Sequence, residues 1–148
     1  MKTFEILSEA EMRTFAGKVA DSLKPGDVVA LIGDLGTGKT TLTKYIAAAL
    51  GVKETVTSPT FNIVKEYHSG RLPLYHFDVY RIGSSEDMFE IGCEEYFFGD
   101  GVSVIEWADL IEEILPENTT YIPKRQYSYR VIGSSWGFDS LPRLAKII

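Results

Sequence analysis

The sequence has a single cysteine, Cys93, among its 148 residues, which excludes a disulfide within the chain and fits a reducing compartment. No apolar run approaches the ~20 residues of a membrane-spanning helix, and the first residues carry acids where a signal peptide needs an apolar core. We therefore expect a soluble, cytoplasmic protein with no membrane partner. Basic residues are also scarce, since 15 Lys and Arg stand against 21 Asp and Glu, a net charge of −6. This balance argues against a main task of gripping the phosphate backbone of a nucleic acid.

The length suits one domain, and we expect a single domain over residues 1–148. The run VVALI at 28–32 is apolar on both faces, as in a central parallel strand. Strand and helix patterns alternate around it, which predicts an α/β fold with a mixed, mainly parallel sheet and helices on both faces. The expected strands are 3–7, 28–32, 61–68, 72–80, 102–107, 119–123 and 127–133, with 61–68 and 72–80 forming an antiparallel hairpin. We expect one helix directly after Ser8, a second from 39 to about 50, one or two short helices within 85–98, and a last short helix that ends at Pro116.

A phosphate-binding loop is indicated directly after the strand at 28–32. Gly33, four further residues and then Gly38, Lys39 and Thr40 match the pattern G-x-x-x-x-G-K-[ST]. The glycines let successive backbone N–H groups point at phosphate oxygens, and the following helix adds the positive end of its dipole. Lys39 would reach the β- and γ-phosphates, and the Thr40 hydroxyl would bind Mg²⁺. A glycine-rich turn with a surface lysine is the alternative, but motif, strand and helix agree.

Two acids end apolar strands and are candidates to serve a metal beside that loop. Glu106 ends VSVIE, and Asp78 ends LYHFD, so both carboxylates would reach the carboxyl edge of the sheet, where α/β proteins bind ligands. We assign Glu106 to the metal or its water shell, and Asp78 to the attacking water or a second metal contact. The two roles are interchangeable on this reasoning. A solvated acid at a strand end is the alternative for each.

The segment TSPTF at 57–61 is stiff and rich in hydroxyls, because Pro59 fixes its own φ and restricts the residue before it. It would place Ser58 or Thr60 near the γ-phosphate as a switch loop. An ordinary turn before a strand is the alternative, and local physics alone favours it.

Four segments in this order resemble the bacterial TsaE (YjeE) family: GDLGTGKTT (33–41), TSPTF (57–61), YHFDVYR (75–81) and VIEW (104–107). The resemblance covers 28 to about 110 well, and HFDVYR and IEW at this spacing are its most specific parts. It implies a small P-loop ATPase needed to make threonylcarbamoyladenosine next to the anticodon of tRNA. The cofactors it implies are ATP and Mg²⁺, and the choice of ATP over GTP depends on the resemblance alone. The partners it implies are a TsaD–TsaB pair, which the ATP cycle would reset, so tRNA would be met only through the complex.

The resemblance also assigns roles to residues. Thr40 and Glu106 would serve Mg²⁺, and Asp78 would be needed for hydrolysis, with Lys39 as a further catalytic group. Phosphate-binding residues would be Gly33, Gly36, Thr37, Gly38, Lys39, Thr40 and Thr41. Switch-like residues would be Ser58, Pro59, Thr60, His76, Asp78 and Arg81. Ser8 and Arg130 are added as candidate contacts at the edge of the nucleotide, and Trp107 as a cover for the site, a partner contact or a core residue.

Three rival functions compete with a slow, partner-dependent ATPase. A small P-loop kinase would need an arginine-rich lid, which is missing among the six arginines, and a GTPase would need an N-K-x-D string, which is absent. A non-hydrolysing nucleotide-binding adaptor is excluded least well, because the same loop can bind nucleotide without turnover.

The stretch PKRQYSYR at 123–130 interleaves basic and aromatic residues, as RNA-binding surfaces do. At this net charge an edge strand with outward charges is favoured for it.

Overall fold

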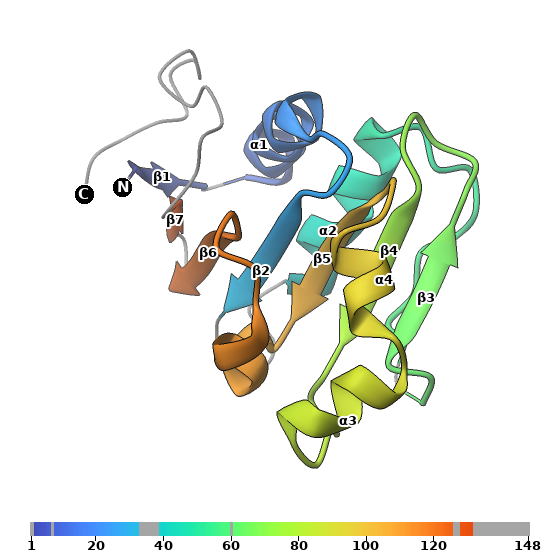
Figure 1. The fold of residues 1–148 in the computed structure, drawn as a ribbon. Helices are drawn as coiled ribbons and strands as arrows, with labels where there is room; N and C mark the ends of the chain where they lie inside the picture. The colour runs from blue at the N-terminus through green and yellow to red at the C-terminus, as the bar shows by residue number, and fades with distance from the viewer. Residues whose placement is uncertain (1, 7, 33–38, 60, 126–127, 132–148) are drawn as a thin grey trace.

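The computed structural model describes residues 2–6, 8–32, 39–59, 61–125 and 128–131. Seven strands form one sheet in the order β1-β7-β6-β2-β5-β4-β3, with helices on both sides (Figure 1). The strands are Lys2–Glu5 (β1), Val28–Ile32 (β2), Val64–Tyr67 (β3), Leu74–Asp78 (β4), Val102–Glu106 (β5), Thr120–Arg125 (β6) and Ser128–Val131 (β7). The helices are Glu9–Ser22 (α1), Lys39–Ala49 (α2), Ser85–Glu90 (α3), Cys93–Phe97 (α4) and a 3-10 helix, Ala108–Ile114 (η1).

The four central strands, β6, β2, β5 and β4, run parallel, while β1, β7 and β3 pair antiparallel at the two sides. This arrangement confirms the α/β class with a mixed sheet whose centre is parallel. The hairpin is confirmed as well, because Val64 of β3 lies opposite Phe77 of β4 and Tyr67 lies opposite Leu74. Its first strand is shorter than expected, because Ile63 has φ 65° and the extended backbone of β3 begins only at Val64.

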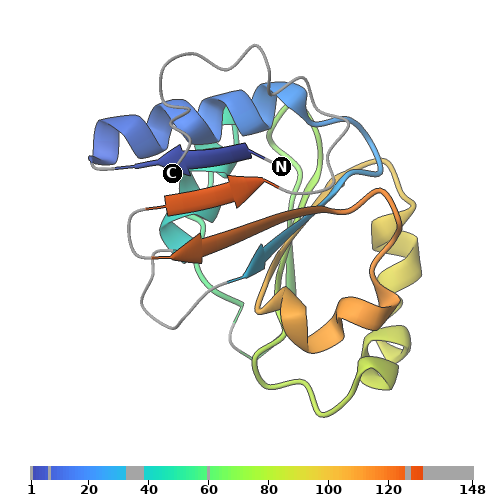
Figure 2. The ribbon, with the colours of Figure 1, turned by 90° about the vertical axis from the view of Figure 1, so that its left-hand side faces the viewer.

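Two apolar cores lie on opposite faces of the sheet, which is why β2 and β5 are buried on both sides. Val29 and Leu31 of β2 pack in the core under α1 and α2, whereas Val28 and Ala30 pack in the core under α3, α4 and η1. Figure 2 shows the two helical layers on either side of the strands. The continuous apolar run at 28–32 thus has the central, doubly covered position that its sequence predicts.

Helix boundaries follow their local chemistry. The Ser8 hydroxyl caps α1 by accepting a hydrogen bond from the Glu11 amide at 3.1 Å. Gly51, with φ +87°, lies just beyond the end of α2, in the left-handed conformation that makes glycine common after a helix C-terminus. Gly92, with φ +77°, separates α3 from α4, so the predicted helical stretch at 85–98 is two short helices.

The last two strands join the sheet in an order that the sequence pattern did not predict. β6 pairs parallel with β2, and β7 lies between β6 and β1. The expectation of an edge strand at 123–130 is therefore wrong for β7, because β1 is the outermost strand on this side. The N-terminal strand covers β7 and provides its second set of backbone hydrogen bonds.

Candidate functional site

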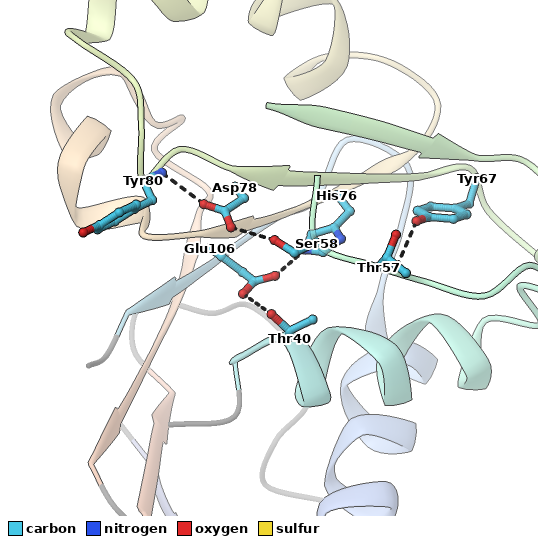
Figure 3. A network of polar contacts seen from close by, with 8 residues as sticks. All are labelled: Thr40, Thr57, Ser58, Tyr67, His76, Asp78, Tyr80 and Glu106. Atoms are coloured by element: carbon cyan, nitrogen blue, oxygen red, sulfur yellow. Dashed lines mark hydrogen bonds and ion pairs between the residues drawn. The ribbon is translucent and has the colours of Figure 1, made fainter. Parts of the chain in front are cut away.

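Two carboxylates lie side by side at the carboxyl edge of the sheet. Asp78 is the last residue of β4 and Glu106 the last residue of β5, and the two are paired in the parallel register of these strands. Side chains alternate between the two faces along a strand, so Asp78 lies on the face of Leu74 and Glu106 on that of Val104, which is the face that α2 covers (Figure 3). The predicted convergence of the two acids is what the register produces.

The Glu106 carboxylate is almost completely buried and both of its oxygens have partners. Its residue is 2 % exposed. Oε1 accepts a hydrogen bond of 2.7 Å from the Thr40 hydroxyl in the first turn of α2, and Oε2 contacts Nε2 of His76 on β4. A buried carboxylate is costly unless it is hydrogen-bonded, so Thr40 and His76 hold this group in one orientation between helix and strand (Figure 3).

Asp78 is half-buried and is held by the segment that precedes the hairpin. Its Oδ2 accepts a hydrogen bond of 2.8 Å from the Ser58 hydroxyl, and its Oδ1 accepts one of 3.0 Å from the backbone amide of Tyr80. The second bond is a local turn of the kind that Asp favours at the end of a strand. The first joins Asp78 to residues 57–59, the part of the predicted switch segment that the structure describes.

That segment is also attached to the edge strand of the hairpin. The Thr57 amide donates to the Tyr67 hydroxyl at 3.4 Å, and the Lys65 ammonium donates to the Thr57 hydroxyl at 3.0 Å. Pro59 is buried, which fixes the backbone next to Ser58. Residues 57–59 therefore pack against the hairpin with Ser58 directed at Asp78 (Figure 3).

Aromatic side chains lie immediately beyond the two strand ends. Trp107 follows Glu106 with φ 63°, a left-handed backbone that is rare for a bulky residue and clusters at functional sites. Its ring lies 4.7 Å from the ring of Tyr80 between centroids. The Arg81 guanidinium lies 5.6 Å from the centre of the Phe61 ring, which is 86 % exposed. Neither aromatic pairing was predicted from the sequence.

The structure brings five of the predicted site residues together: Thr40, Ser58, His76, Asp78 and Glu106. Two others lie elsewhere, because Ser8 uses its hydroxyl to cap α1 and Arg130 belongs to β7, which β6 separates from β2. Thr41 is exposed on α2, and Lys39 is the first residue of that helix. The side chain of Lys39 lies outside the described part, and so do the residues Gly33, Gly36, Thr37, Gly38 and Thr60.

Sequence reasoning included His76 as a switch-like residue but missed its contact with Glu106. The signal was available in part, because alternation along β4 places His76 on the same face as Asp78. What the pattern did not give is the parallel register, which sets His76 opposite Val104 and so within reach of Glu106, two residues further along β5.

The donor set is of the kind that magnesium uses. Among the described residues, no three His, Cys, Asp or Glu side chains gather as a metal cluster. Mg²⁺ is usually held by one or two protein oxygens together with phosphates and water rather than by a protein cage. A hydroxyl at the start of α2 beside a buried carboxylate meets that requirement.

An α/β sheet with a G-x-x-x-x-G-K-[ST] sequence between a central strand and the next helix, and with acids at neighbouring strand ends, defines a P-loop nucleotide-binding fold. The model of one family, Threonylcarbamoyl adenosine biosynthesis protein TsaE, matches residues 6–131. The chain belongs to the TsaE family, whose role is in the biosynthesis of threonylcarbamoyladenosine in tRNA. Within the described residues, no helix has the length and apolar character to cross a membrane.

Individual relatives agree with this assignment. A tRNA threonylcarbamoyladenosine biosynthesis protein TsaE of Bacillus subtilis is 45 % identical over 133 residues, covering 85 % of this chain and 83 % of the relative. One of Treponema pallidum is 50 % identical over 103 residues, covering 70 % and 76 %. Among solved structures, Bacillus subtilis YdiB superposes with a TM-score of 0.70 at 40 % identity, covering 88 % of this chain and 85 % of that one.

Proposed function

We propose that the chain binds and hydrolyses Mg²⁺–ATP as the accessory, cycle-resetting subunit of the machinery that forms threonylcarbamoyladenosine in tRNA. The observation that carries the proposal is the pair of strand-end carboxylates, one bonded to the first turn of α2 and the other to the 57–59 segment. This arrangement supports a division in which one acid would serve the metal and the other the reacting water.

The phosphates would bind at the start of α2. The glycine-rich sequence between β2 and α2 supplies backbone N–H groups, and an 11-residue helix directs the positive end of its dipole at the same place. The charge of Lys39 would neutralise the β- and γ-phosphates, and Thr41 would contact the α-phosphate. ATP rather than GTP follows from the family, not from the described residues.

Thr40 and Glu106 would hold the magnesium ion. The Thr40 hydroxyl donates a hydrogen bond to Glu106, which leaves the lone pairs of the hydroxyl oxygen available to a metal. Because Glu106 is buried, little water would lie between its side chain and a metal bound beside Thr40, so an electrostatic interaction there would be screened less than at the surface. When bound, the ion would supply positive charge to the phosphate oxygens during transfer.

Asp78 would orient or deprotonate the attacking water. Its carboxylate is half-buried, and the Ser58 hydroxyl and the Tyr80 amide hold it at the sheet edge next to Glu106. The Ser58 contact also links Asp78 to the 57–59 segment, so a change in that segment would move the group that handles the water. This linkage is the physical basis for a switch-like role of the TSPTF and HFDVYR sequences.

The partners we propose are TsaD- and TsaB-like proteins, with tRNA met only through the complex. The charge of the chain supports this division, because α3, α4 and η1 carry eight acidic residues and neither Lys, Arg nor His. In Figure 1, α3 and α4 lie on one side of the sheet, and residues of η1 pack in the same core on that side. A phosphate backbone would be repelled from that side, so we expect little affinity for isolated tRNA at physiological salt.

The test is ATP hydrolysis by the full chain, alone and with a purified TsaD–TsaB pair. We expect slow turnover alone and faster turnover with the pair. Lys39→Ala should abolish hydrolysis and weaken ATP binding, whereas Lys44→Ala, at an exposed position of the same helix, should do neither. Unchanged binding and turnover in Lys39→Ala would contradict the phosphate-loop assignment. Binding without any turnover, with or without the pair, would make the chain a non-hydrolysing adaptor.

A further inference from the structure

His76 makes a contact that the proposed mechanism does not use. The residue is 0 % exposed and lies in the middle of β4, on the face that α2 covers. Its Nε2 contacts Glu106 Oε2, while its Nδ1 is buried and has no hydrogen-bond partner among the described residues. Burying a polar side chain with one unused nitrogen is costly, and the contact with Glu106 is the polar interaction that offsets this cost among the described residues.

The geometry points to His76 as a positioning residue that fixes the orientation of Glu106 toward Thr40. The imidazole N–H occupies Oε2, and Oε1 is then directed at the Thr40 hydroxyl. The neighbouring site residue, Asp78, has its own partners in Ser58 and the Tyr80 amide. Each acid therefore has a separate support, and His76 belongs only to that of Glu106.

This inference depends on the proposed function, since it concerns the carboxylate that would serve magnesium. Partners that orient a metal-binding group typically change metal affinity by about 10–100-fold when removed. Losing the N–H at position 76 would leave one oxygen of a buried carboxylate without a donor, and Glu106 would turn toward any other donor or toward water. The expected result is a weaker effect of Mg²⁺ on nucleotide binding, with metal-free nucleotide binding unchanged.

The experiment measures the dissociation constant of ATP by calorimetry for the full chain, once with Mg²⁺ and once with a chelator. In His76→Leu, we expect the strengthening by Mg²⁺ to fall about 10–100-fold and the chelator value to stay within about twofold. His76→Gln should recover most of the loss, because its amide N–H reaches the position of Nε2. His76→Asn, which is polar but too short, should behave like the leucine variant. His68→Leu is the matched control, since that histidine is exposed and contacts Glu66.

The outcomes separate the two proposals. Equal losses with and without Mg²⁺, or no difference between the glutamine and asparagine variants, would mean that His76 only fills space, and the proposed function would stand. If the wild-type chain binds no nucleotide, both the proposed function and the role of His76 are contradicted. If His76→Leu does not fold, the glutamine and asparagine pair carries the test. A crystal structure of the asparagine variant with Glu106 still bonded to Thr40 would also overturn the inference.

Discussion

Replacing Asp78 separates what this carboxylate does for the fold from what it does for hydrolysis. Asp78→Ala removes the acceptor for the Ser58 hydroxyl at 2.8 Å and for the Tyr80 amide at 3.0 Å. Bonds to a charged acceptor are worth ~1.5–3 kcal/mol each when buried, and this group is partly exposed, so we expect a total loss of about 1–3 kcal/mol. At ~2–4 °C per kcal/mol for a chain of this size, the Tm should fall by roughly 2–12 °C.

Asp78→Asn tests the chemistry with the fold preserved. The amide oxygen can accept from the Tyr80 amide, and the amide nitrogen can donate to Ser58, because a hydroxyl is both donor and acceptor. We therefore expect a loss below about 1 kcal/mol in stability. Hydrolysis should still fall by ~10²–10⁴, because the amide cannot take a proton or orient water as a carboxylate does.

Both variants are compared with Asp109→Asn, an exposed acid on η1, by thermal unfolding, ATP binding and partner-stimulated hydrolysis. ATP binding should remain close to that of the wild type in all three. An Asp78→Asn chain that hydrolyses ATP at the wild-type rate would refute the catalytic role. Equal destabilisation by alanine and asparagine would refute the hydrogen-bond argument.

Three further predictions concern the core and the titratable groups. Phe77→Ala should cost ~3–5 kcal/mol in urea unfolding, since the ring is fully buried and its centroid lies 5.4 Å from that of Tyr96 and 5.7 Å from that of Phe97; a loss below ~1 kcal/mol would contradict the packing. Burial and the Glu66 carboxylate raise the pKa of Tyr96 to about 12, so the folded state favours the neutral phenol. Its contribution to stability is complete below the ordinary tyrosine pKa of ~10 and is lost as the pH rises from there through about 12. Tyr96→Phe should make the Tm depend less on pH in that range, and a pH dependence equal to that of the wild type would count against the raised pKa. Burial raises the pKa of the Cys93 thiol, whose residue is 1 % exposed, so native protein should react slowly with a thiol reagent and quickly in denaturant; equal rates would place the thiol at the surface.

Much of the fold follows from the sequence because the central strands are marked by their burial. The run at 28–32 is apolar throughout, and that at 102–106 is apolar except for Ser103 and the terminal Glu106, a pattern typical of strands covered on both faces. The order of β6, β7 and β1 did not follow, because pairing between the two ends of a chain depends on long-range contacts rather than local pattern. The late start of the expected strand at 61–68, which begins at Val64, follows from the positive φ of Ile63, a conformation that its residue type disfavours.

The site was predictable where strand alternation decides it. Asp78 and Glu106 end their strands, and a parallel register brings the carboxyl ends of neighbouring strands together. Predicting the contact of His76 with Glu106 requires the register of the two strands. Predicting the contact of Ser58 with Asp78 requires the path of the 57–59 segment. Trp107 follows a strand, and its left-handed backbone has no signal in the residue type.

The most direct test of the account is a crystal structure of the chain with Mg²⁺ and a non-hydrolysable ATP analogue. The account predicts triphosphate at the start of α2 and a magnesium ion ~2.0–2.1 Å from the Thr40 hydroxyl oxygen, with Glu106 bound to it directly or through water. Asp78 should then face the terminal phosphate. A nucleotide bound elsewhere, or a metal held by neither Thr40 nor Glu106, would contradict it.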